Sequence, residues 1–111
     1  MARQFGAGHT AIVTNGEATI RLGPVPPRQV WNIVRYAISS SGLTEGKCYL
    51  YETGIANNQL IDSTYDGTQN QGDLNIELGP GDTLIFHWKD CDPVGGGPTV
   101  TASIRYTFEL Q

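Results

Sequence analysis

Few side chains in this sequence are of the types that commonly carry chemistry. The chain holds two histidines and two cysteines, at His9, His87, Cys48 and Cys91. A zinc site needs three or four ligands held close together, and neither an H-x-H nor a C-x-x-C spacing occurs. His87 stands between Phe86 and Trp88, so in a strand it would face away from them, toward solvent or a partner. We predict no metal and no cofactor.

Carboxylates gather in and beside the polar stretch from residue 54 to residue 72, which indicates a long loop with one short strand inside it. Asp62, Asp66 and Asp73 lie near Asn70, and their oxygens could serve as calcium ligands. The spacing D-x-x-x-D-G differs from that of the EF-hand loop, and loop aspartates usually hydrogen-bond to their own turns. The turn-forming role is the expectation, and calcium binding is the alternative.

Sequence signatures of catalysis are missing. No G-x-S-x-G turn, P-loop or dinucleotide-binding G-x-G-x-x-G occurs in the chain. The run Gly95–Gly97 lies between two expected strands, and no helix follows it whose dipole could hold a phosphate. We therefore predict a protein that is not an enzyme and has no catalytic residues.

The two cysteines are too few for a disulfide framework. We expect both to be reduced, one as a small buried side chain and the other as a loop thiol. The alternative is a bridge between Cys48 and Cys91, which would require two strand ends to meet.

Two tyrosines offer a candidate binding surface. Tyr49 and Tyr51 share one face of the segment KCYLYET, opposite Cys48 and Leu50. Aromatic side chains in a row could stack on a sugar or contact a protein partner. We favour a second interpretation over a binding surface: this face packs beneath a neighbouring loop, while the opposite face joins the core.

These side chains must be positioned by β-strands, because hydrophobic residues alternate along much of the chain. In TVTASIRYTFEL they fall at every second position from Val100 to Leu110, which is typical of a half-buried antiparallel strand. Residues 84–88 repeat the alternation. The residues expected in the core are Val100, Ile104, Tyr106 and Phe108, together with Leu84 and Phe86.

Turn residues divide the chain at regular intervals. Asn15-Gly16 is a strong hairpin signal, and Pro80-Gly81 suits a type II turn. Residues 30–38 also fit a helical spacing, but their β-branched and aromatic side chains favour a strand, with a helix as the alternative. We expect about eight strands, near residues 9–14, 17–22, 29–39, 47–53, 59–63, 74–78, 83–89 and 99–110. This pattern predicts an all-β fold, a single-domain antiparallel β-sandwich of the jelly-roll kind.

The composition restricts the partners of such a domain. The chain has 111 residues, of which 16% are charged, and its net charge is −4. Its seven lysines and arginines are scattered along the sequence, whereas nucleic-acid binding needs clustered cations. No window is apolar enough to span a membrane, and the start at Met1 lacks the pattern of a signal peptide. We expect neither nucleic acid nor membrane as a partner.

The first residues are interpreted as an arm. Residues 1–8 precede the first expected strand, so the sandwich domain is assigned to residues 9–111. Free chain ends usually fray unless something holds them. Phe5 could act as an apolar anchor, and Arg3 could pair with an acidic group. We expect the arm to lie on a neighbouring subunit, and the alternative is that Phe5 folds back over its own sandwich.

Several stretches resemble a known group of proteins. They are PPRQVWNIVRYAIS, CYLYE, LIDSTYDGTQNQGDLN, ELGPGDTLIFHWKDCDPVGGGPT and the alternating final strand, which together cover roughly residues 24–110. Their order resembles that of small β-sandwich virion proteins of tailed bacteriophages, notably phages of actinobacteria. Most of the shared motifs are turn residues.

The resemblance implies a structural, non-enzymatic role in a virion, assembled in the host cytoplasm, where cysteines stay reduced. It implies a capsid decoration or minor head protein, with a homotrimer favoured over a dimer. The partners would be other copies of the chain and a larger virion protein such as the major capsid protein. The candidate partner-binding residues are Arg3, Phe5, Tyr49 and Tyr51. A minor tail protein and a module that binds host-surface glycans are the alternatives.

Overall fold

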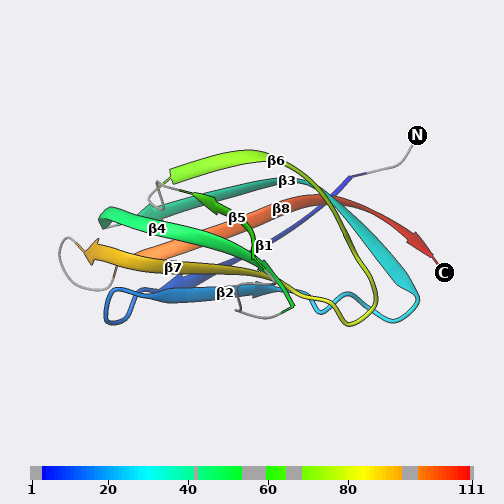
Figure 1. Cartoon of the computed structure of the whole chain (residues 1–111), viewed down its shortest axis with the longest axis horizontal. Helices are drawn as coiled ribbons and strands as arrows, with labels where there is room; N and C mark the ends of the chain where they lie inside the picture. The colour runs from blue at the N-terminus through cyan, green and yellow to red at the C-terminus, as the bar shows by residue number, and fades with distance from the viewer. Residues whose placement is uncertain (1–3, 42, 54–59, 65–68, 94–97, 111) are drawn as a thin grey trace.

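The computed structural model describes residues 4–41, 43–53, 60–64, 69–93 and 98–110. In these ranges the chain forms eight β-strands and no helix. The strands are β1 (Phe5–Ile12), β2 (Ala18–Leu22), β3 (Gln29–Ser41), β4 (Leu43–Glu52), β5 (Leu60–Thr64), β6 (Gln69–Leu78), β7 (Leu84–Pro93) and β8 (Thr99–Leu110). Most of them run along the long axis of a body that measures 46 × 28 × 20 Å (Figure 1).

The strands form two four-stranded sheets that pack face to face. The first has the order β1-β8-β3-β6, and the second has the order β2-β7-β4-β5. Each strand runs antiparallel to its neighbours. Every connection except β4–β5 crosses from one sheet to the other, which is the double Greek-key arrangement of a jelly roll. The predicted all-β sandwich of about eight strands is confirmed.

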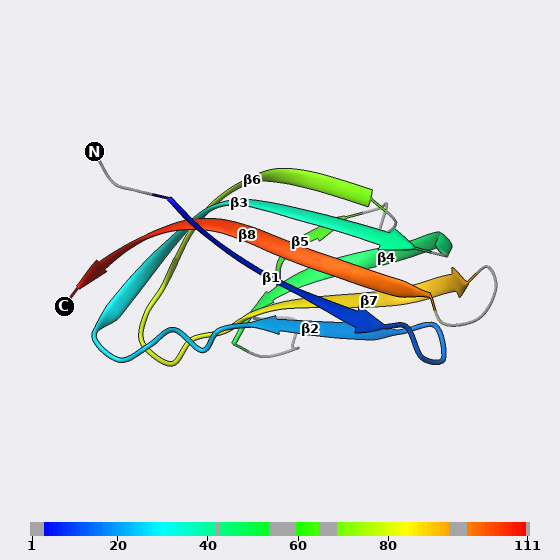
Figure 2. The same cartoon turned by 180° about the vertical axis from the view of Figure 1, so that it is seen from behind.

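A continuous apolar core lies between the sheets. The second sheet contributes Leu84, Phe86 and Trp88, which are all fully buried, and the first contributes Ile33, Val100 and Ile104. The prediction holds for Tyr106, which is partly buried and packs against the core, but it is wrong for Phe108, which is 36% exposed. The reason is visible in Figures 1 and 2, where the C-terminal part of β8 runs past the ends of β2 and β7.

Both predicted turns form, but the strands on either side of one of them do not pair with each other. Asp82 N donates to Gly79 O at 3.1 Å and Gly81 has a φ of 85°, so Pro80-Gly81 occupies a type II turn. Asn15 and Gly16 have φ values of 53° and 77°, as a type I′ turn requires. The strands on either side of that turn do not pair as a hairpin, however, because β1 pairs with β8 and β2 pairs with β7.

Residues 30–38 are part of strand β3, so the helical alternative is wrong. Their side chains face the core at Ile33, Tyr36 and Ile38. A register shift between Ile33 and Arg35 explains the change of parity along the strand, because a bulge adds one residue to the alternation.

The N-terminal arm is shorter than predicted. Residues Phe5 to Gly8 belong to β1 and pair with β8, where Phe5 stands opposite Tyr106 and Ala7 opposite Ile104. The assignment of residues 1–8 to an arm outside the sandwich is therefore wrong for these four residues. Backbone pairing with β8 orders this segment even though glycine and alanine bury little apolar surface. Arg3 lies outside the described residues.

Several other strands are longer than expected, among them β4, which begins at Leu43 instead of residue 47. Strand β6 begins at Gln69, so its first residues come from the stretch interpreted as loop. Strand β7 continues to Pro93 instead of ending at residue 89. Asp90 has a φ of 54°, and the pairing with β4 shifts there, so the strand passes through a bulge where the sequence indicated a turn.

The glycine at position 72 makes room for a core tyrosine. A Cβ on Gly72 would lie 3.0 Å from Cε1 and 3.3 Å from Cζ of Tyr36, whose side chain is 5% exposed. We expect Gly72→Val to lower the free energy of unfolding by about 1–3 kcal/mol, because a buried ring must move. Urea denaturation measures the change.

Gly6→Val is the matched control for this substitution. Gly6 also lies in an edge strand, but a Cβ there would meet its nearest atoms at 3.8 Å, an ordinary contact distance. Equal losses of stability for the two variants would contradict the packing role of Gly72.

None of the described residues forms a helix that is long and apolar enough to cross a membrane.

Candidate functional site

The side chain of His87 points away from the core, as predicted, but it is only 12% exposed. His87 lies in the middle of β7, on the face opposite Phe86 and Trp88, and its Nε2 is 3.3 Å from Oε1 of Glu17. Its Nδ1 is buried and has no hydrogen-bond partner among the described residues. His9, on β1, is exposed. The two histidines belong to different sheets, so the fold does not combine them in one site.

The two tyrosines of β4 share the outer face of the second sheet. Tyr51 is only 6% exposed, and its ring centroid is 6.4 Å from that of His87. Tyr49 is half-buried, and the Lys89 ammonium lies 5.6 Å from its ring centroid. A buried Tyr51 cannot offer its ring to a sugar, so the pair does not form the open aromatic platform that stacking requires. The burial of Tyr51 agrees better with the alternative interpretation, in which this face of β4 is covered.

Both cysteines are free and buried. Cys48 belongs to the core. Cys91 packs against Gly46, because a Cβ added to that glycine would lie only 3.0 Å from the Sγ atom of Cys91. Burial raises the pKa of the Cys91 thiol, and the negative charges of Asp90 and Glu17 raise it further. The thiol therefore stays protonated near neutral pH, which makes it a poor nucleophile. The predicted loop thiol is instead part of a packed strand.

The structure describes two of the three aspartates that were considered as calcium ligands. Asp73 forms an ion pair with Arg35, with Oδ1 3.1 Å from Nη1. Asp66 lies outside the described residues, and Asp62 pairs with Leu50 through the backbone of β5. Among the residues that the structure describes, no group of three or more histidines, cysteines, aspartates or glutamates is placed to hold a metal ion.

Phe5 has partners within its own chain. Its ring centroid lies 5.9 Å from that of Tyr106 and 5.1 Å from that of Phe108, and Tyr106 in turn stacks on Trp31 at 4.1 Å. These rings form a row along the end of the first sheet that extends past β2 and β7. Phe5 thus folds back on its own sandwich, the alternative considered above. A contact with a neighbouring subunit would have to use the parts of these aromatic rings that remain exposed.

A shallow groove crosses the outer face of the first sheet, on the side away from the core. One half, of about 410 Å³, lies over β1, β8 and β3, and the other, of about 420 Å³, lies over β8, β3 and β6. Ala37 and Ser103 line both halves, so the two adjoin each other. We call this feature the outer groove. Its floor is low because a cross-strand row of residues without large apolar side chains passes beneath it: Gly8, Ser103, Ala37 and Gln71.

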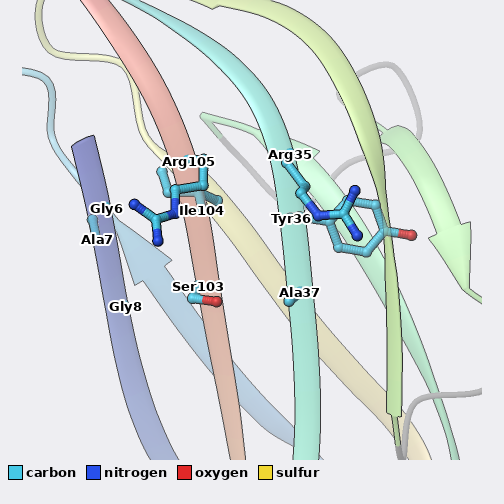
Figure 3. Close-up of a pocket in the computed structure, with 9 residues that line it drawn as sticks. All are labelled: Gly6, Ala7, Gly8, Arg35, Tyr36, Ala37, Ser103, Ile104 and Arg105. Atoms are coloured by element: carbon cyan, nitrogen blue, oxygen red, sulfur yellow. The ribbon is translucent and has the colours of Figure 1, made fainter. Parts of the chain in front are cut away.

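Two arginines border the outer groove. Arg35 of β3 and Arg105 of β8 stand directly opposite each other in the strand pairing, and both line the first half. Figure 3 shows their guanidinium groups turned apart, that of Arg105 toward β1 and that of Arg35 toward β6, with Ser103 and Ala37 between. Like charges placed opposite each other on a sheet destabilise it. Arg35 is relieved by Asp73, whereas Arg105 has no ion-pair partner among the described residues.

The outer groove was missed at the level of sequence. Arg35 and Arg105 are 70 residues apart in the chain, and the arginines were judged to be scattered. The alternation in the final strand does place Arg105 on the polar face. That Arg35 lies beside it follows only from the pairing of β8 with β3. Because of the bulge in β3, simple alternation along that strand does not predict which face of the sheet carries the Arg35 side chain.

The strand order and the buried core define the chain as a jelly-roll β-sandwich. No family model and no curated protein matches its sequence. Among solved structures, it is similar to PliG of Aeromonas hydrophila, a periplasmic lysozyme inhibitor of g-type lysozyme, with a TM-score of 0.42 and 19% sequence identity. The match covers 97% of this chain and 88% of that chain. Similarity at this level gives no information about function.

Proposed function

We propose that the protein is a non-enzymatic structural component of a tailed-phage virion, a capsid decoration or minor head protein that occupies symmetric sites on the particle. Its partners are other copies of the chain, in a trimer, and a larger virion protein such as the major capsid protein. The sequence resemblance over residues 24–110 motivates this proposal. Double-sheet jelly rolls are a frequent capsid architecture, which supports it by analogy of fold.

The observation that carries the proposal is the apolar end of β8. Phe108 is 36% exposed and Leu110 is 74% exposed, and both lie where β8 extends past the second sheet. Apolar side chains grouped on a surface often mark a contact with another protein. Covering them by association would remove this surface from water, which stabilises the assembly in proportion to the apolar area buried. We assign this end of the molecule to the subunit contact.

The proposal predicts self-association that depends on this end. At micromolar concentration the protein is expected to behave as a homotrimer in light scattering coupled to size exclusion. The double substitution Phe108→Ser, Leu110→Ser should shift it to monomers. Ile12→Ser is the matched control, because Ile12 is 67% exposed but lies at the opposite end of the first sheet, beside Thr99. A monomeric wild type, or an equal effect of Ile12→Ser, would contradict the assignment.

Association with particles is the second readout. Mass spectrometry of purified virions, with heads and tails separated, should find the protein in the heads. Detection in tails alone would favour the minor tail protein instead. Absence from both fractions would overturn the virion role.

A further inference from the structure

We propose that the outer groove is a binding site for an acidic oligosaccharide, one whose sugar rings carry carboxylates. This site lies on the opposite sheet from the two tyrosines of β4, and it does not depend on a role in a virion. It is built from the guanidinium of Arg105, which has no ion-pair partner in the described part of the chain, the low floor around Ala37 and Ser103, and the polar side chains of the second half.

Charge argues for an anionic ligand. The chain has a net charge of −4, yet two arginines occupy directly opposed positions on neighbouring strands at this groove. Asp73 neutralises Arg35 only, through an exposed ion pair with side-chain exposures of 45% and 87%. A carboxylate bound beside Arg105 would relieve the remaining repulsion, and a guanidinium can donate two parallel hydrogen bonds to it. The ligand would therefore supply a negative charge beside Arg105.

The rest of the lining argues for sugar hydroxyl groups. The side chains of Ser39, Thr101, Gln69 and Gln71 line the second half of the groove. Their hydroxyl and amide groups both donate and accept hydrogen bonds, which matches the paired donor and acceptor character of a sugar hydroxyl. Crossing four strands gives the groove a length of about 14 Å at the usual strand spacing. This length accommodates more than one ring.

Other ligand classes fit the groove less well. An extended peptide usually binds by adding a strand to a free sheet edge or by filling apolar pockets. The centre of this groove lies over β8 and β3, which are paired on both sides. Nucleic acids need aromatic side chains on which bases stack, and the one aromatic residue in the lining, Tyr36, has its ring in the core. Neutral sugars would lack the same stacking surface, so the carboxylate must supply the affinity.

The test is a titration with defined ligands, measured by calorimetry at low ionic strength. The acidic probes are tetramers of galacturonate, mannuronate and hyaluronan. The comparison ligands are a neutral galactose tetramer and a tetraglutamate peptide. We expect at least one acidic saccharide to bind with a dissociation constant below about 1 mM, and added salt should weaken this binding because exposed charges are screened.

Two variants locate the site, and a third serves as the matched control. Arg105→Gln removes this guanidinium and should weaken binding at least about tenfold, a change of about 1.4 kcal/mol. Ala37→Leu raises the floor shared by both halves and should weaken it similarly. Arg21→Gln makes the same change of charge at an exposed position on β2, in the other sheet, and should leave binding unchanged.

Four results would overturn the proposal. They are failure of all three acidic saccharides to bind, equal binding of the neutral tetramer, equal binding of tetraglutamate, and a loss with Arg21→Gln as large as that with Arg105→Gln. Thermal unfolding of each variant checks that the fold is retained. Because the titration uses the isolated protein, its outcome is distinguishable from that of the virion experiments.

Discussion

Replacing Ile104 by aspartate is expected to abolish cooperative folding. Ile104 is 2% exposed and lies between Ala7 of β1 and Tyr36 of β3 in the centre of the first sheet. Burying an unpaired carboxylate costs several kcal/mol, and the lost apolar side chain removes about 1.5–3 kcal/mol more. Together these terms approach the total stability of a small domain, about 5–15 kcal/mol. Circular dichroism and thermal unfolding provide the measurement.

The matched control introduces the same charge one residue away. Arg105→Asp lies on the exposed face of the same strand, beside Arg35, so the new carboxylate faces a cation instead of the core. We expect this variant to fold with nearly the stability of the original chain. An Ile104→Asp protein that unfolds cooperatively near the same temperature would contradict the position of β8 in the core.

Deleting residues 1–7 is expected to lower the melting temperature by about 5–15 °C, corresponding to about 1.5–3 kcal/mol for a domain of this size. The deletion removes the Phe5 ring from Tyr106 and Phe108. It also removes three residues of β1 that pair with β8. The single substitution Phe5→Ala separates the contribution of the ring from that of the strand. An unchanged melting temperature after deletion would mean that this segment does not stabilise the isolated chain.

The same deletion tests the expectation that the N-terminal segment docks onto a neighbour. A truncated protein that is less stable but still joins particles would show that the segment acts within its own subunit. A truncated protein of unchanged stability that no longer joins particles would show the opposite. The contacts of Phe5 with Tyr106 and Phe108 favour the first result.

Strand positions could be read from the sequence because local chemistry determines them. The alternation in the final strand and the Pro80-Gly81 turn depend only on neighbouring residues. The structure confirms the turn and strand β8, although burial follows the alternation only from Val100 to Arg105. The predicted start of strand β1 lies too far along the chain because its first residues, FGAG, have little local strand propensity. It becomes a strand through backbone pairing with β8, and a pairing partner 100 residues away leaves no local signal.

The candidate site depended on pairings of this distant kind. Neither the position of Arg35 opposite Arg105 nor the groove over Ala37 follows from the residues near them in sequence. For the tyrosines of β4, alternation correctly placed both on one face, and the burial of Tyr51 agrees with the favoured interpretation that this face is covered. Alternation gives the direction of a side chain, but what lies above it is decided by the rest of the fold.

The position of β8 between β1 and β3 affects how the chain can be made. During synthesis, β1 and β3 leave the ribosome long before the strand that joins them. The first sheet therefore cannot close until β8 has emerged, and pairings between distant segments form slowly. In that interval the unpaired edges of β1 and β3 are open to other nascent chains.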